Sequence, residues 1–202
     1  TVDAVRGVSL NGSGGGQLFV TDFSTLGING GIVAEGLYLD TVVFDSDPAD
    51  PDFSGDTVIG GTLSVGSGAD PVDTFGIVLN NVSGDLSFTD LDIFTTNGVG
   101  LRCTSGAVFD PANGAGFRLT TPAGSTVSAV GGPAVDLNQV TTNLTFDDIS
   151  STNSATVGLQ LVQTNGSFFA GATSQIVNPT SGGVNLSGGN VSFTYNGTIN
   201  NT

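Results

Sequence analysis

The chain has 202 residues, and its 18 acidic residues face only three basic ones, with no lysine and no histidine. The net charge of −15 excludes nucleic acid and anionic membranes as partners, because binding either requires a basic surface. Without histidine or lysine, Ser-His-Asp, Cys-His and Schiff-base catalysis are excluded. A single cysteine and no histidine leave no zinc site.

The composition still predicts an ordered chain. Charged residues make up only 10%, and 32 glycines punctuate short apolar segments that include 13 phenylalanines. Disordered chains are poor in aromatic and β-branched residues. No apolar run reaches the length of a membrane span, so we expect no membrane insertion. The chain begins at Thr1 without a basic, apolar leader, which we interpret as a processed part of a longer protein.

A four-residue motif recurs along the chain, with glycine or alanine, an apolar residue, any residue and a second apolar residue. This alternation predicts a short strand with one buried face. The copies are Gly7-Val8-Ser9-Leu10, Gly36-Leu37-Tyr38-Leu39, Gly76-Ile77-Val78-Leu79, Gly100-Leu101-Arg102-Cys103, Gly116-Phe117-Arg118-Leu119, Ala134-Val135-Asp136-Leu137, Gly158-Leu159-Gln160-Leu161 and Gly183-Val184-Asn185-Leu186.

An acidic stretch over residues 45–56 follows the second copy of the motif. Clustered aspartate oxygens suit Ca²⁺, which takes six to eight oxygen ligands. The spacing is not that of an EF-hand, so a solvated acidic loop is the alternative. Asp70 and Asp73 could join the site if the strands stack. The predicted ligands are Asp45, Asp47, Asp50, Asp52 and Asp56.

A second element follows several copies of the motif after a polar gap that contains asparagine and glycine. It is an apolar-x-Phe triplet, at residues 86–88, 144–146 and 191–193, with a looser version at 167–169. Each pair of elements is too small to bury its own face, but stacked pairs build one continuous interior. The irregular but recurrent spacing of the motifs predicts a single-stranded parallel β-helix of about eight coils with short strands and Gly/Asn-rich turns.

We expect one β-solenoid domain or segment over residues 1–202, with less regular coils in 1–74 and regular coils in 75–202. The alternative is an antiparallel β-sandwich, whose strands recur every 8–12 residues. The recurrent order of the same two elements favours the β-helix. No segment has a helical pattern of 11–18 residues, so we expect almost no helix.

In pattern and composition the coils resemble those of right-handed parallel β-helix proteins, namely the adhesin and passenger regions of bacterial surface proteins and the pectate-lyase-like solenoids. The resemblance covers residues 75–202 well and 1–74 loosely. It implies a secreted or cell-surface location. It implies no activity, because this architecture serves both enzymes and inert rods.

The remaining reactive groups do not predict an enzyme. Asp147 and Asp148 adjoin each other, and neighbours on a strand point to opposite faces, so they suit glycoside hydrolysis only at a bend. Cys103 lies in an apolar stretch and is predicted to be a buried thiol. The only possible cofactor is therefore Ca²⁺.

The last predicted strand indicates self-assembly. Val191, Phe193 and Tyr195 form one more coil strand, with no charged cap after it. Exposed strand edges pair readily with another chain, so we expect copies to stack end to end into filaments. The predicted function is an extracellular structural or adhesive protein of the cell surface or biofilm matrix. The alternative is a secreted polysaccharide-binding or polysaccharide-degrading β-helix, for which surface glycans would be partners.

Overall fold

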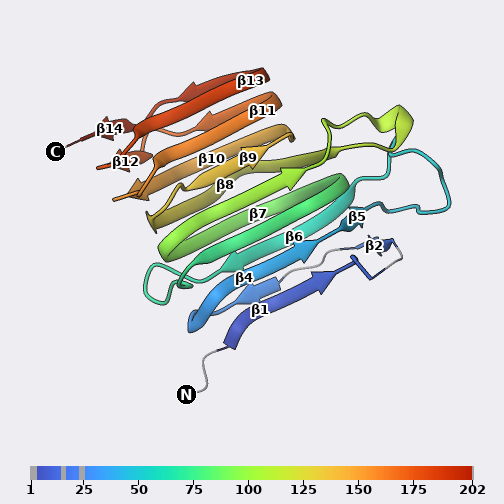
Figure 1. Ribbon diagram of the computed structural model, residues 1–202, viewed down its shortest axis with the longest axis horizontal. Helices are drawn as coiled ribbons and strands as arrows, with labels where there is room; N and C mark the ends of the chain where they lie inside the picture. The colour runs from blue at the N-terminus through green and yellow to red at the C-terminus, as the bar shows by residue number, and fades with distance from the viewer. Residues whose placement is uncertain (1–3, 15–16, 23–25, 202) are drawn as a thin grey trace.

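The computed structural model describes residues 4–14, 17–22 and 26–201 (Figure 1). Over these residues the strands form one 14-stranded sheet and there is no α-helix. Every strand pairing is parallel, which confirms the all-β prediction and excludes the antiparallel sandwich. In the described part of the chain, no helix is long and apolar enough to cross a membrane.

The elements follow one another with short connections, apart from three longer loops at 45–57, 66–74 and 106–116. The only helical segment in the described residues is the 3-10 turn Pro111–Asn113. The strands are β1 (Ala4–Asn11), β2 (Leu18–Val20), β3 (Leu26–Ile28), β4 (Ile32–Asp40), β5 (Val42–Phe44), β6 (Val58–Val65), β7 (Phe75–Ser105), β8 (Phe117–Gly131), β9 (Val135–Asn138), β10 (Thr141–Thr152), β11 (Val157–Ala170), β12 (Gln175–Val177), β13 (Gly182–Tyr195) and β14 (Thr198–Asn200).

Seven of the eight motif copies lie side by side in the sheet, where about eight coils were expected. We call the stretch of chain from one of these motif copies to the next a pass. The apolar residues of the motif form two columns that point inward, and each pass contributes one residue to each column. The first column is Val8, Leu37, Ile77, Leu101, Val135, Leu159 and Val184. The second column is Leu10, Leu39, Leu79, Cys103, Leu137, Leu161 and Leu186.

The glycine of the motif is explained by a close approach of two backbones. A Cβ on Gly76 would lie 2.6 Å from the carbonyl oxygen of Gly100, on the next pass, and 2.1 Å from Cγ2 of Ile93. These two distances leave no room for a side chain at residue 76. Glycine therefore allows the two passes to lie this close together.

For the eighth copy, residues 116–119, the predicted alignment with the other motif strands is wrong. Phe117 pairs with Gly84, so this segment is a second-element strand. The cause is the loop at 106–116, which delays the next motif copy until residues 134–137. The passes that follow carry no such insertion and are shorter.

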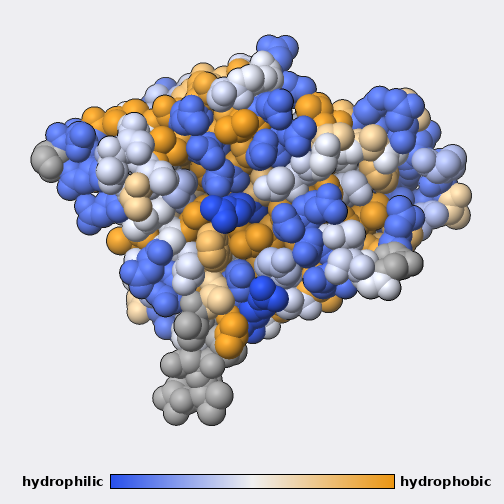
Figure 2. All heavy atoms as spheres, in the orientation of Figure 1, coloured by the Kyte–Doolittle hydropathy of each residue, from blue (hydrophilic) through white to orange (hydrophobic). Residues whose placement is uncertain are grey.

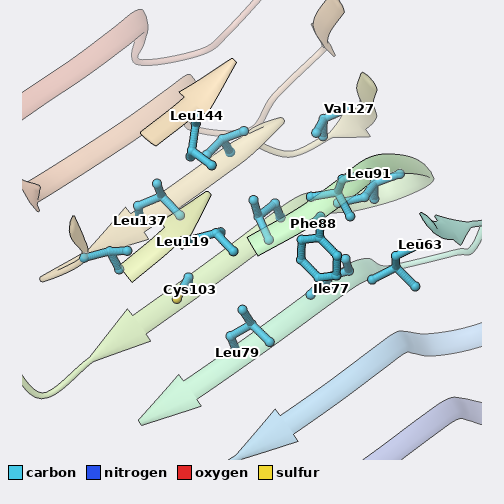
Figure 3. Packing of buried hydrophobic residues seen from close by; sticks show 14 of the residues in the cluster. Leu63, Ile77, Leu79, Phe88, Leu91, Cys103, Leu119, Val127, Leu137 and Leu144 are labelled. Carbon is cyan, nitrogen blue, oxygen red and sulfur yellow. The ribbon is translucent and has the colours of Figure 1, made fainter. Parts of the chain in front are cut away.

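One continuous core runs along the sheet, from Ile28 to Ile176. In Figure 3, Leu79 and Cys103, from two passes of β7, and Leu137, from β9, follow one another. Cys103 is fully buried, and burial raises its pKa well above the usual value, which confirms the prediction of a buried thiol. Desolvation of this kind keeps a thiol protonated and unreactive.

For the looser second element, residues 167–169, the predicted phase is wrong by one residue. Phe168 is buried and Phe169 is 37% exposed, whereas the triplet ending at residue 169 placed Phe169 inside. The Phe168 ring lies between the rings of Phe146 and Phe193, with centroid distances of 5.9 and 5.6 Å. This aromatic stack extends the core to the last described pass.

The bends between strands recur at matching positions in successive passes. Thr41, Asn81, Gln139 and Gln163 each follow a motif strand and have φ between 49° and 58°. Such left-handed residues turn the chain sharply. At this corner the Asn81 side-chain amide donates to the Thr41 hydroxyl at 3.4 Å, so side chains as well as backbones stack from pass to pass.

Candidate functional site

Two loops leave the sheet on the same side and contact each other; we call them the lateral loops, residues 45–57 and 106–116 (Figure 1, upper right). The rings of Phe53 and Phe109 stack with centroids 6.1 Å apart and 9° between their planes. The Phe53 backbone N–H donates to the carbonyl of Pro111 at 2.9 Å. Each loop therefore braces the other, although the two lie far apart in the sequence.

An ion pair between the partly exposed Arg118 and the buried Asp85 anchors the base of the lateral loops. Arg118 donates through Nε to Asp85 Oδ1 at 2.9 Å and through Nη2 to Oδ2. The Thr57 hydroxyl donates to the same Oδ2 at 2.6 Å. Hydrogen bonding to Asp85 raises the pKa of Arg118, and the guanidinium also lies 4.6 Å from the centroid of the Phe109 ring. One carboxylate thus fixes the roots of both loops.

Most carboxylates of the acidic stretch accept hydrogen bonds from backbone N–H groups two residues ahead. Asp45 accepts from Asp47 at 2.9 Å, Asp50 from Asp52 at 3.2 Å, and Asp52 from Ser54 at 2.7 Å. Asp45 is buried at the root of the loop, only 3% exposed. These bonds shape the loop, because aspartate favours local turns of this kind.

Three of the five predicted calcium ligands converge. Carboxylate oxygens of Asp50, Asp52 and Asp56 all lie within 4.8 Å of one another, and Asp45 and Asp47 are outside this group. Asp56 Oδ2 is shielded from solvent and has no hydrogen-bond partner. The pKa of Asp56 is raised, first by desolvation and then by the charges of Asp45, Asp50, Asp47 and Asp52.

This trio fits a hard cation in its donor chemistry, because a shielded carboxylate oxygen without a donor is a place where a positive charge is favourable. The other two candidates are engaged elsewhere. Asp70 accepts from the Gly30 backbone N–H at 3.2 Å, and Asp73 accepts from the Asn97 side chain. Neither Asp70 nor Asp73 belongs to the converging group.

Two hollows lie beside the lateral loops and share Gln17, Val43 and Ser83 in their walls. The larger, about 290 Å³, is lined by uncharged side chains and backbone. The smaller, about 220 Å³, is lined in part by Asp45, Asp50, Phe19 and Phe53. Carboxylates and aromatic rings thus meet in one place, which sequence reasoning missed because Phe19 is far from the acidic stretch in the chain.

The adjacent pair Asp147 and Asp148 does not belong to this site. Asp147 is exposed, and Asp148 Oδ1 accepts from the Ser150 hydroxyl at 2.9 Å. The pKa of Tyr195 is raised to about 12, first by burial and then by the charge of Asp148. No third acidic residue joins this pair among the described residues.

The predicted interface residues lie in β13, but they are not the most exposed apolar residues at this end of the sheet. Val191, Phe193 and Tyr195 are partly buried against the core. Leu186 is 47% exposed and Ile199 is 51% exposed. Neither exposure was predicted. Leu186 is the last leucine of the second column, so among the described residues only Leu161 neighbours it in the column and its other side is exposed to solvent.

The opposite end of the sheet is open in the same way. Leu10, in β1, is 36% exposed, and Val5 is 67% exposed. Among the described residues, β1 pairs only with β4, and β13 only with β11. Figure 2 shows apolar side chains among polar ones along the upper edge, where β13 lies in Figure 1.

Charged side chains are distributed unevenly along the chain. Residues 149–202 contain no charged side chain. The three arginines are each paired with a carboxylate, Arg6 with Glu35, Arg102 with Asp136 and Arg118 with Asp85. The unpaired negative charge therefore belongs to the earlier passes and the lateral loops.

Searches against protein-family models, curated proteins and solved structures found no match for this chain.

Proposed function

We propose that the chain is a right-handed, single-stranded parallel β-helix and that it serves as an extracellular structural or adhesive module. In this proposal copies stack end to end into filaments of a cell surface or biofilm matrix. The fold proposal is supported by the regular register of the last passes, in which each motif strand pairs with the next without a shift.

The observation that carries the assembly proposal is that the inner columns continue to both ends and emerge there as exposed leucines. Leu10 and Leu186 belong to the same column, and both face solvent at 36% and 47% exposure. Apolar side chains on an open strand edge favour pairing with another chain.

Negative-stain electron microscopy across protein concentration, with and without Ca²⁺, tests this function. We expect filaments of uniform width for the unmodified chain and only short rods for Leu186→Asp, because a carboxylate at the contact must be desolvated. Asn143→Asp adds the same charge to an exposed position on the wall and is the matched control. Short separate rods for the unmodified chain at every concentration contradict the proposal.

Ca²⁺ is the proposed cofactor, with the trio Asp50, Asp52 and Asp56 as its protein ligands. The cation would offset the mutual repulsion of the carboxylates and so stabilise the lateral loops. The shielded Asp56 Oδ2 supports this role. Its effect is measurable as a shift in melting temperature, with the variants given in the Discussion.

Glycan binding is a second candidate, favoured by the hollow that combines Phe19 with Asp45 and Asp50. Aromatic rings and carboxylates together suit sugar recognition. They do not favour hydrolysis, because the carboxylate oxygens of the trio lie within 4.8 Å of one another, closer than the roughly 5–9.5 Å that separates the carboxyl pairs of glycosidases. A glycan array with the unmodified chain and Phe19→Ala tests this candidate. Binding that is lost in Phe19→Ala supports it, and no binding to any glycan contradicts it.

A further inference from the structure

We propose that copies of this chain stack head to tail in one defined register, with β13 of one copy pairing in parallel with β1 of the next. The inference rests on the proposed end-to-end assembly and specifies its partner and geometry. Because the two contacting surfaces are different, each added copy leaves the same two ends open, so the contact propagates into a polar filament.

The register follows from the motif that both end strands carry. Within one copy, Leu159 pairs with Val184 and Val8 pairs with Leu37. Continuing both columns across the contact places Val184 opposite Val8 and Leu186 opposite Leu10 of the next copy. Both columns then run unbroken from copy to copy, and the two exposed leucines become buried.

A glycine at the open end supports the same register. A Cβ on Gly7, Gly36, Gly76 or Gly158 would lie within 2.5–2.9 Å of a carbonyl oxygen on the following pass. At Gly183 the three nearest atoms all belong to the Ile199 side chain, so the position that a carbonyl fills elsewhere is open. In the proposed register the carbonyl of Gly7 from the next copy fills it.

The outward side chains beside the columns form a ladder that can extend across the contact. Arg102 Nε donates to Asp136 Oδ2 at 3.2 Å, Gln160 Nε2 donates to Asp136 Oδ1 at 2.9 Å, and Asn185 Nδ2 donates to Gln160 Oε1 at 3.3 Å. The residue of β1 in this row is Ser9, which pairs with Tyr38. Its hydroxyl in the next copy is placed to donate to the Asn185 amide oxygen.

Charge favours this contact over side-by-side association. No side chain after Asp148 is charged, and Arg6 of β1 is neutralised by Glu35 at 2.8 Å. The contact therefore opposes no like charges, whereas walls that carry the net charge of −15 repel one another.

Disulfide trapping tests the register. The double variant Ser9→Cys/Asn185→Cys places the two cysteines opposite each other. Their Cα atoms are then separated by about the 4.8 Å spacing of neighbouring strands, which a disulfide can bridge. Cys103 is fully buried and can remain. After mild oxidation we expect a ladder of covalent multimers on a non-reducing gel. Each single variant, and Ser9→Cys/Gln160→Cys, with one thiol a strand further in, are the controls and should give no ladder.

Each other outcome overturns the register, and electron microscopy of the same samples separates its failure from that of the proposed function. Covalent dimers from Asn185→Cys alone would mean tail-to-tail contact. Filaments without a ladder would mean that assembly occurs through another surface. Neither filaments nor a ladder would overturn both proposals.

Discussion

The passes before Gly131 and those after it contribute to the same two columns, but they differ in their inserted loops and in their charged residues. After Leu137 the second column advances in nearly equal steps, to Leu161 and then to Leu186, with no inserted loop. Before it, the steps that end at Leu79 and at Leu137 are longer, and this region holds both lateral loops and all three arginines.

The comparison teaches where this architecture leaves room for chemistry. Within a regular pass, each inward position is fixed by the residue above and below it, so changes are constrained by packing. An inserted loop is free of that constraint, since it stands outside the register. The acidic trio and the aromatic contact of the lateral loops occur in these insertions, whereas residues 149–202 of the regular passes contain no charged side chain.

The largest expected effect is in the regular region. Phe168→Ala removes a fully buried ring from the aromatic stack, and we expect a loss of about 3–5 kcal/mol in the free energy of unfolding. Phe169→Ala is the matched control, because its ring is 37% exposed, and should cost less than about 1 kcal/mol. Chemical denaturation measures both. A larger loss for Phe169→Ala than for Phe168→Ala would mean that the strand has the opposite phase.

A smaller effect is expected at the base of the lateral loops. Arg118→Gln leaves the buried Asp85 carboxylate without its cation, and we expect a loss of about 1–2 kcal/mol, limited because water screens the partly exposed guanidinium. Arg6→Gln disrupts a more exposed pair with Glu35 and should not change stability measurably. Thermal unfolding of the two variants compares them, and equal effects would show that Asp85 does not anchor the loops.

The smallest effect is expected in the acidic trio, and it depends on pH. Asp56 has a folded pKa above the ordinary carboxyl value of 3.8. Its contribution to stability is therefore fully present below that value and is lost as the pH rises through the folded pKa. Without Ca²⁺, Asp56→Asn should raise the melting temperature slightly at neutral pH, and the gain should vanish in acid.

Addition of Ca²⁺ gives a second test of the same site. Both the cation and Asp56→Asn reduce the repulsion between the carboxylates of the trio, the cation by neutralising charge and the substitution by removing it. The unmodified chain should gain melting temperature on addition of Ca²⁺ and lose it in chelator, whereas Asp56→Asn should gain little. Asp147→Asn removes one exposed charge outside the trio and should respond like the unmodified chain. A melting temperature of the unmodified chain that is the same in Ca²⁺ and in chelator rules out a structural ion.

The sequence was sufficient to predict the columns but not the phase of every strand. Alternation identifies which residues share a face, so Val135 and Leu137 could be placed inside. It does not fix register, which is set by loop length, and the loop at 106–116 therefore hid the true pairing of Phe117. At Phe168 and Phe169, two adjacent phenylalanines satisfy either phase, and only the neighbouring strand decides.

The candidate site was predictable in composition but not in geometry. Five aspartates within residues 45–56 indicated a cation site, yet the turns of the loop bring together only Asp50, Asp52 and Asp56. The direction of each side chain depends on these turns and not on composition. The contact between Phe53 and Phe109 joins loops of different passes, and no local pattern encodes such a distant contact.

The arginines have a practical consequence for proteolysis. Trypsin-like proteases have three cleavage points in this chain, after Arg6, Arg102 and Arg118, and all three bonds lie within strands or at their starts. A protease cuts such bonds only when the strand opens. Cleavage after Arg118 therefore reports opening of interior strands, whereas cleavage after Arg6 reports fraying of β1 alone. If β1 is covered by a second copy, Arg6 should become resistant as the protein concentration rises.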